Sequence, residues 1–185
     1  MKSLFWNVRG LANAPSRLAL KRFLNVHKPD FCFISEPWMN FESLPRGWFS
    51  NLGYKLFALN IRDNLQPNLW CLCTFNINPT PILITDQLVS FTFDYNNTKC
   101  GMAAVYASTC YLKRRQPWSS LQSIHHLNPI PWNIIGDFVS ILGAFENRSH
   151  FPPSRTSIAD FQSWIDNNHF IHLPTSGASF TWQNG

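Results

Sequence analysis

Short apolar runs of strand length dominate the hydrophobic pattern of this chain. Each run is four to eight residues long in its apolar part and is bounded by Gly, Pro, Asn or Asp, which is typical of β-strands. The pattern predicts strands over residues 3–8, 31–35, 54–61, 69–75, 88–95, 102–108 and 132–139, and shorter ones over 170–173 and 179–182. The last of these leads into Asn184-Gly185, a dipeptide typical of hairpin turns.

Three segments instead have the spacing of an amphipathic helix. The first begins near Pro15, presents apolar residues from Leu18 to Val26 and is ended by Pro29. The second follows a basic trio at residues 113–115, and the third covers residues 158–167. Strands greatly outnumber helices and two of the helices connect strands, so we predict one α/β domain over residues 1–185, built of two packed sheets with helices outside.

Isolated polar residues end four of the predicted strands. Asp137 closes the most apolar short run of the C-terminal half, and Asn7, Glu36 and Tyr106 lie at the ends of three other runs. In the strand predicted over residues 132–139, Asp137 and Val139 point to the same side. Two carboxylates, an amide oxygen and a phenol are the ligands and the hydrogen-bond donor expected of a Mg²⁺ phosphodiester site.

Each of these four side chains also has a plainer interpretation. Asn7 fits a turn at a strand end, Asp137 fits the N-cap of a following turn, and Tyr106 fits a core aromatic residue with its hydroxyl at the rim. The case for a functional role is strongest for Glu36, because a carboxylate directly after five apolar or small residues is seldom only a surface charge.

The composition is poor in charge and rich in aromatic residues. Charged residues make up 14% of the chain, against about 25% in a typical soluble domain, and aromatic residues make up 15%. This balance indicates apolar surface that additional chain would normally cover. The net charge of +5 favours an anionic partner such as nucleic acid. Arg9, Lys113, Arg114 and Arg115 are candidates to contact a DNA backbone, although a basic trio at a helix start is also typical of a solvated face.

The five cysteines are scattered through strand-like runs and predict reduced thiols. Cys71 and Cys73 lie two residues apart, which suits one face of a buried strand better than a metal pair, and none of the six histidines has ligand spacing. The N-terminus has no signal-peptide core, and no apolar run reaches 18 residues. We expect an intracellular protein of the nucleus or cytoplasm, with no membrane association and no obligate protein partner.

Five motifs together resemble a known superfamily. In order they are WNVRGL at residues 6–11, PD leading to SE at 29–36, VYAS at 105–108, IIGDF at 134–138, and SG leading to FTWQNG at 176–185. The chain is similar to the endonuclease/exonuclease/phosphatase superfamily, and more narrowly to the apurinic-type endonuclease domain of plant LINE-type non-LTR retrotransposons.

The resemblance implies a four-layered α/β sandwich, with mainly antiparallel sheets between helices, and a site for phosphodiester hydrolysis. The reaction would depend on Mg²⁺, with Mn²⁺ as an alternative, and would nick DNA. By the same resemblance Asn7 and Glu36 would hold the metal, Tyr106 would contact the scissile phosphate, and Asp137 would activate or orient the attacking water.

Two departures from the family pattern bear on activity. Val139 stands where the family has Asn, so a hydrogen bond to the transition state is missing; such a loss costs on the order of 10²- to 10³-fold in rate. The sequence also stops before the family's later Asp and its Ser-Asp-His segment. We therefore expect a degenerate copy, truncated before its last strands, whose nicking activity is weak or lost. Two alternatives stay open: a non-catalytic nucleic-acid-binding remnant, and a phosphomonoesterase or lipid phosphodiesterase of the same superfamily.

Overall fold

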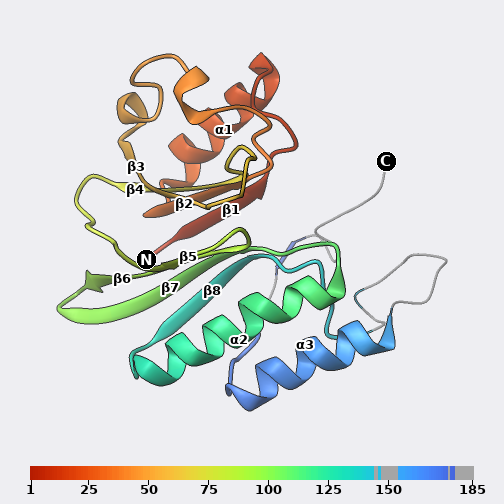
Figure 1. The fold of residues 1–185 in the computed structure, drawn as a ribbon. Coiled ribbons are helices and arrows are strands. Elements are labelled where there is room, and N and C mark those ends of the chain that lie inside the picture. Colours follow the sequence, from red (N-terminus) through yellow and green to blue (C-terminus); the bar gives the residue numbers. More distant parts are fainter. Residues whose placement is uncertain (144–145, 147–153, 175, 178–185) are drawn as a thin grey trace. The chain divides into compact units, whose positions relative to one another are not determined.

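The computed structural model describes residues 1–143, 146, 154–174 and 176–177 (Figure 1). These residues divide into two compact units. The first unit comprises Met1–Ala107 and Ile130–Asp137, and the second comprises Ser108–Pro129 and Phe138–Gly185. The expectation that the chain is a single domain stays a prediction.

One sheet of the first unit has the strand order β1-β2-β4-β3. Its strands are β1 (Ser3–Asn7), β2 (Phe31–Ser35), β3 (Tyr54–Leu59) and β4 (Leu69–Thr74). β1 and β2 are parallel with Asn7 opposite Ser35, and the other two pairings are antiparallel. Because β1 and β2 end together, Asn7 and the residue that follows Ser35 lie at the same edge of the sheet.

The other sheet has the order β5-β6-β7-β8. Its strands are β5 (Thr80–Ile84), β6 (Leu88–Tyr95), β7 (Thr98–Tyr106) and β8 (Trp132–Asp137). β7 and β8 are parallel and pair Tyr106 with Asp137, whereas β5–β6 and β6–β7 are antiparallel. Both sheets are thus mixed and mainly antiparallel, and the last parallel pair delivers two polar side chains to one edge.

The core of the first unit lies on both faces of the β1-β2-β4-β3 sheet. Phe31 and Phe33 of β2 belong to a cluster that also contains Phe91 and Met102 of the other sheet, so the two sheets pack face to face. Cys32 and Ile34, which alternate with the two Phe residues, belong to a second cluster that contains Leu20 and Leu24 of α1 (Ala14–His27). β2 is therefore buried on both faces, as its unbroken apolar sequence requires.

Local signals in the sequence explain the bounds of α1. The Asn13 side chain accepts a hydrogen bond from the Ser16 amide at 2.7 Å and caps the start of the helix. Lys28 has a left-handed backbone (φ 44°) and donates its N–H to the Leu24 carbonyl, which ends the helix. Two short 3₁₀ helices, Phe41–Ser43 and Ser50–Leu52, lie between β2 and β3.

The second unit is built around aromatic packing between α2 (Tyr111–Leu127) and α3 (Arg155–Asn167). Trp118 of α2 stacks on Trp164 of α3 with ring centroids 4.8 Å apart, and Phe161 and Phe138 pack against Trp118. The Ser154 side chain caps α3 by accepting from the Ser157 amide. These rings supply the buried apolar area that a two-helix unit needs.

The predicted α/β class with two mainly antiparallel sheets is confirmed, and three details of the prediction were wrong. β5 was missed because Pro79 and Pro81 argue against a strand; the structure places it at a sheet edge, where proline is tolerated. Residues 170–173 form no strand. The strand predicted over residues 132–139 stops at Asp137. Val139 has a left-handed backbone (φ 46°), so strand alternation does not extend to Val139.

Several other expectations concern composition and the C-terminal segment. The expected strand at 179–182 and the turn at Asn184-Gly185 lie outside the described residues.

All five cysteines are free, as predicted. Burial raises the pKa of the Cys32 thiol to about 12 and that of Cys73 to about 11, which makes both unreactive. No helix in the described part of the chain is long and apolar enough to cross a membrane.

Candidate functional site

Four strand ends of the first unit bring together the side chains of Asn7, Glu36, Tyr106 and Asp137. The Asn7 amide donates from Nδ2 to Glu36 Oε1 at 2.6 Å and to Asp137 Oδ2 at 3.2 Å. The Tyr106 hydroxyl donates to the same Glu36 oxygen at 2.8 Å. All four residues that the sequence singled out as metal-binding or catalytic are therefore in one hydrogen-bonded cluster, contributed by both sheets.

Glu36 is held in place by its backbone as well as by its side chain. Its N–H donates to the Asn68 carbonyl at 3.0 Å, and its own carbonyl accepts from the Gly10 N–H at 2.8 Å. Its φ of 52° lies in the left-handed region, which is unfavourable for a residue other than Gly, Asn or Asp. Such strain persists only where surrounding contacts fix it, and it is concentrated at functional sites.

The Asn7 side chain has one polar atom without a partner. Its Oδ1 is buried and accepts no hydrogen bond, although burying an unpaired amide oxygen is costly. Asn7 and Tyr106 both use Oε1 of Glu36, so neither of them occupies the other carboxylate oxygen. An amide oxygen and a carboxylate oxygen are hard ligands of the kind that Mg²⁺ and Mn²⁺ prefer. The residues present therefore fit a divalent cation.

The cluster has neither the His nor the Cys ligands typical of zinc or copper sites. Among the residues that the structure describes, no group of three or more His, Cys, Asp or Glu side chains could hold a metal ion. Within the cluster only Glu36 and Asp137 are acidic, and the other two members are an amide and a phenol. A site with few protein ligands suits Mg²⁺, which usually keeps several of its waters and completes its shell with substrate phosphate.

The Tyr106 hydroxyl is kept protonated by its surroundings. Burial raises the pKa of Tyr106 well above its ordinary value, and the hydrogen bond to Glu36 and the negative charges of Glu36 and Asp137 raise it further. The cation of Arg62 acts in the opposite direction. Tyr106 can therefore serve as a hydrogen-bond donor at any physiological pH, but not as a base.

Gly136 allows β8 to lie close enough to β7 for this geometry. A Cβ atom at position 136 would overlap the Val105 carbonyl oxygen. Gly136 pairs with Val105, and the next pair along the ladder is Tyr106 with Asp137. The glycine in the GDF motif thus has a steric role beside the acidic residue.

Asn60, which the sequence analysis did not single out, braces the cluster from behind. This buried side chain accepts hydrogen bonds from the Asn68 and Leu69 amides at 2.9 Å and donates to the Asp86 carbonyl at 2.6 Å. Asn68 in turn accepts the N–H of Glu36. An Asn at a strand end was the available signal, but no surrounding motif distinguished Asn60 from other turn residues.

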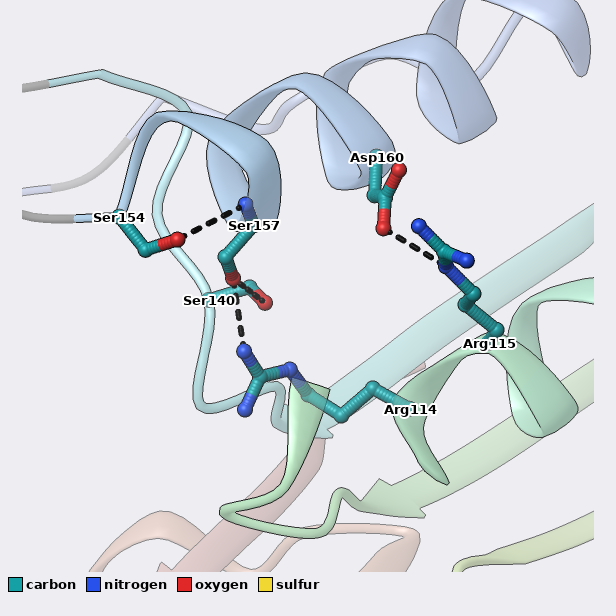
Figure 2. Close-up of polar contacts among 6 residues, drawn as sticks. All are labelled: Arg114, Arg115, Ser140, Ser154, Ser157 and Asp160. Carbon is teal, nitrogen blue, oxygen red and sulfur yellow. Dashed lines mark hydrogen bonds and ion pairs between the residues drawn. The ribbon is translucent and has the colours of Figure 1, made fainter. Parts of the chain in front are cut away.

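The four basic candidates lie in different settings. Arg9 is exposed in the first unit and has a left-handed backbone (φ 46°). Lys113 is exposed on α2 in the second unit, where Arg115 makes a 2.9 Å ion pair with Asp160 (Figure 2). Arg114 is only 6% exposed. Its contact with DNA stays a prediction, as does that of the other three.

The Arg114 guanidinium is committed to contacts inside the second unit. It donates to the Ser108 and Thr109 carbonyls at 2.9 and 3.0 Å. It also donates to the Ser157 hydroxyl at 2.7 Å (Figure 2). Burial lowers the pKa of Arg114, and the three neutral acceptors satisfy its N–H groups by charge-assisted hydrogen bonds. This geometry favours a structural role that ties the start of α2 to α3.

Comparison with solved structures identifies nucleases with the same fold. The endonuclease domain of TRAS1, a telomere-specific non-LTR retrotransposon, matches with a TM-score of 0.67 at 11% identity, over 90% of this chain and 70% of that one. An AP endonuclease from Archaeoglobus fulgidus matches with a TM-score of 0.65 at 13% identity, over the same two shares. The human Nocturnin catalytic domain matches with a TM-score of 0.53 at 18% identity, over 74% of this chain and 63% of that one.

These likenesses show a shared α/β fold, the fold expected of the endonuclease/exonuclease/phosphatase superfamily. No protein-family model matches the sequence, and no curated protein matches it. The chain spans less than two thirds of the Nocturnin domain. Residue roles consequently rest on the geometry of the Asn7, Glu36, Tyr106 and Asp137 cluster.

Proposed function

We propose that this chain is a divalent-metal-dependent phosphodiester hydrolase domain that acts on DNA, related to the endonucleases of LINE-type retrotransposons. The convergence of Asn7, Glu36, Tyr106 and Asp137 from four separate strand ends is the observation that carries the proposal. The shared fold with the TRAS1 endonuclease domain supports the retrotransposon origin, and the net charge of +5 supports an anionic substrate. The link to plants specifically rests on the sequence motifs alone.

Asn7 and Glu36 would hold the metal, through the unpartnered Asn7 Oδ1 and the Glu36 carboxylate. Bound Mg²⁺ or Mn²⁺ supplies charge neutralisation at the phosphate and stabilises the departing oxygen. Asn7 has a second function, because its Nδ2 donates hydrogen bonds to both carboxylates and fixes their positions relative to each other.

Asp137 and Tyr106 would act on the reacting groups. Hydrolysis joins the oxygen of a water molecule to phosphorus and breaks the bond to the departing oxygen, which takes a proton from solvent. Asp137 would accept the proton that the water loses. Tyr106, kept protonated by burial and by Glu36, would donate a hydrogen bond to a phosphate oxygen as negative charge builds up there.

A plasmid-nicking assay tests this assignment. Purified protein is incubated with supercoiled plasmid in Mg²⁺ or Mn²⁺, with EDTA as the metal-free control. We expect open circles from the wild type and from Glu42→Ala, which removes an exposed carboxylate that is not part of the cluster. Glu36→Ala and Asn7→Ala should abolish nicking, and nicking that survives Glu36→Ala would contradict the proposal.

Val139 favours a second candidate function, a nucleic-acid-binding domain without catalysis. By family resemblance this position carries an Asn whose amide takes part in the reaction, and a valine side chain offers neither donor nor acceptor. Binding of labelled DNA in EDTA, combined with no metal-dependent nicking even at high protein concentration, would establish this candidate. Turnover that requires Mg²⁺ and Glu36 would exclude it.

A further inference from the structure

Trp38 is an exposed aromatic side chain immediately beside the cluster. It lies two residues after Glu36 and leaves 67% of its surface accessible to solvent. A large apolar side chain gains little stability from such a position. Its location therefore calls for an explanation other than packing.

The backbone around Trp38 is fixed in an unfavourable conformation. Glu36 and Trp38 have φ values of 52° and 51°, and Arg9 on the adjoining loop has φ 46°. Two hydrogen bonds join the loops, from the Gly10 N–H to the Glu36 carbonyl at 2.8 Å and from the Leu11 N–H to the Pro37 carbonyl at 2.9 Å. A left-handed backbone is strained at bulky residues. These hydrogen bonds therefore fix the Trp38 loop in a conformation that is unfavourable for its residues.

The indole of Trp38 rests on Gly10. A Cβ atom at Gly10 would lie 3.1 Å from Cε3 of the indole, and Gly10 itself has φ 104°, so a side chain there would be both crowded and strained. The ring thus has a defined support while most of its surface faces solvent. A ring that is already held in position loses little conformational freedom when it binds a partner.

We propose that Trp38 is a stacking platform for an unpaired nucleobase, and that Arg9 on the adjoining loop contacts the phosphate backbone of the same strand. This inference rests on the proposed function and adds the form of the substrate. An indole face recognises a flat aromatic group, and an exposed arginine beside it suits a polyanion. A base inside a duplex has both faces covered by its neighbours, so stacking on Trp38 requires a base that has left the stack.

The spacing of Trp38 from Glu36 sets the position of that base along the strand. Two residues span at most about 7 Å of backbone. The base on Trp38 therefore belongs to a nucleotide near the phosphate at Glu36. Substrates with a bulge, a frayed end or a single-stranded segment at the reacting phosphate should bind better than a continuous duplex.

Binding in EDTA tests the platform without any need for catalysis. Fluorescence anisotropy would compare a labelled single-stranded oligonucleotide, the same strand with abasic sites, and its duplex. Phe75→Ala is the matched control, because Phe75 is also an exposed aromatic residue (55%) and follows β4 at the end opposite to Glu36. Trp38→Phe keeps an aromatic face and guards against a folding defect in Trp38→Ala.

We expect Trp38→Ala to weaken single-strand binding by about 5- to 150-fold, the range for losing one stacked base. Trp38→Phe and Phe75→Ala should stay within about twofold of the wild type, and abasic strands should bind the wild type and Trp38→Ala alike. Arg9→Ala should instead reduce the salt dependence of binding.

Equal binding by Trp38→Ala and Phe75→Ala would overturn the platform, as would an equal loss on normal and abasic strands or a wild type that binds no nucleic acid. Because EDTA prevents hydrolysis, the outcome is independent of the nicking assay. A protein that never nicks DNA can still show base-dependent binding through Trp38, and failure of the proposed catalysis is thereby distinguished from failure of the platform.

Discussion

Val139 combines a left-handed backbone conformation with a β-branched side chain. Its φ of 46° lies in the left-handed region, where a β-branched side chain is strained and Asn is several-fold enriched. By family resemblance the position carries Asn. The backbone therefore has a conformation that suits the Asn expected from the resemblance, and the valine side chain does not suit it.

Val139→Asn should consequently increase both stability and activity. Relief of left-handed strain should raise the free energy of unfolding by about 1 kcal/mol, because Val139 is 39% exposed and Asn loses little apolar burial there. The returning amide should raise the nicking rate by on the order of 10²- to 10³-fold. Denaturant unfolding and the plasmid assay measure the two effects.

Val139→Ala is the matched control for this substitution. It shortens the side chain but supplies neither an amide nor the left-handed preference of Asn, so it should increase neither quantity. A variant Val139→Asn that is less stable than the wild type would show that the valine side chain, and not its backbone strain, determines stability at this position.

Tyr106 makes the stability of the folded chain depend on pH. Because its pKa is raised in the folded chain, its stabilising contribution is complete below the ordinary tyrosine pKa near 10 and is lost as pH rises through the folded value. Tyr54 also ionises late, since burial raises its pKa to about 12. Absorbance titration of tyrosinate should therefore show two late steps.

Tyr106→Phe should remove one of these late steps and make stability fall less steeply above about pH 10. Tyr54→Phe should remove the other step and leave the contribution of Tyr106 intact. Unfolding by denaturant at a series of alkaline pH values measures the slopes. Identical slopes for the wild type and Tyr106→Phe would mean that Glu36 and burial do not perturb Tyr106.

At the scale of elements, Asn60 joins the two sheets beside the cluster. It follows β3, binds the amides at the start of β4, and donates to the turn between β5 and β6. The same turn accepts the Tyr106 N–H through the Gln87 carbonyl at 2.9 Å, and Asn68 accepts the Glu36 N–H at 3.0 Å. One buried amide thereby fixes the supports of two site residues that lie in different sheets.

Asn60→Ala should destabilise the first unit by on the order of 3 kcal/mol or more, because several buried donors and acceptors lose their partner at once. Asn25→Ala on the exposed face of α1 is the control and should leave stability unchanged or slightly higher, since alanine is the better helix former. Denaturant unfolding measures both. A loss below about 1 kcal/mol would show that water replaces the Asn60 amide.

The strands differ in how well the sequence alone predicts them. β2 and β6 could be predicted because the continuous apolar run of β2 and the alternating apolar and polar residues of β6 are both local signals. β5 could not, because its prolines are acceptable only at a sheet edge, and edge position depends on the whole topology. Three of the four residues at 170–173 are apolar, but this segment pairs with no strand in the described part of the chain, and Ile171 is 86% exposed.

The same distinction holds for the cluster. Asn7, Glu36, Tyr106 and Asp137 could be selected because each ends an apolar run, and parallel pairing in both sheets brings the ends together. The importance of Asn60 could not be predicted, because its partners come from segments that meet only after both sheets form. The convergence of the four cluster residues follows from the sheet topology, whereas the functions of the individual residues stay predictions.

At the scale of the whole molecule, metal binding should appear as a gain in thermal stability. A cation that binds the folded chain raises its stability by RT ln(1 + [M]/Kd), about 2.7 kcal/mol at 100 times Kd. For a chain of this length each kcal/mol corresponds to roughly 2–4 °C in Tm. We therefore expect Mg²⁺ or Mn²⁺ to raise the Tm by about 5–10 °C near saturation.

That gain should depend on the cluster and not on ionic strength. Glu36→Gln and Asn7→Ala should lose the metal-dependent shift, because they remove the carboxylate and the otherwise unpartnered Asn7 Oδ1. Glu42→Gln should keep the shift, and NaCl at equal ionic strength should not reproduce it. Without the metal, Glu36→Gln should be as stable as the wild type or more so, since it removes one of two neighbouring negative charges. A shift that persists in Glu36→Gln would place the cation elsewhere and would leave the strand-end cluster without its metal.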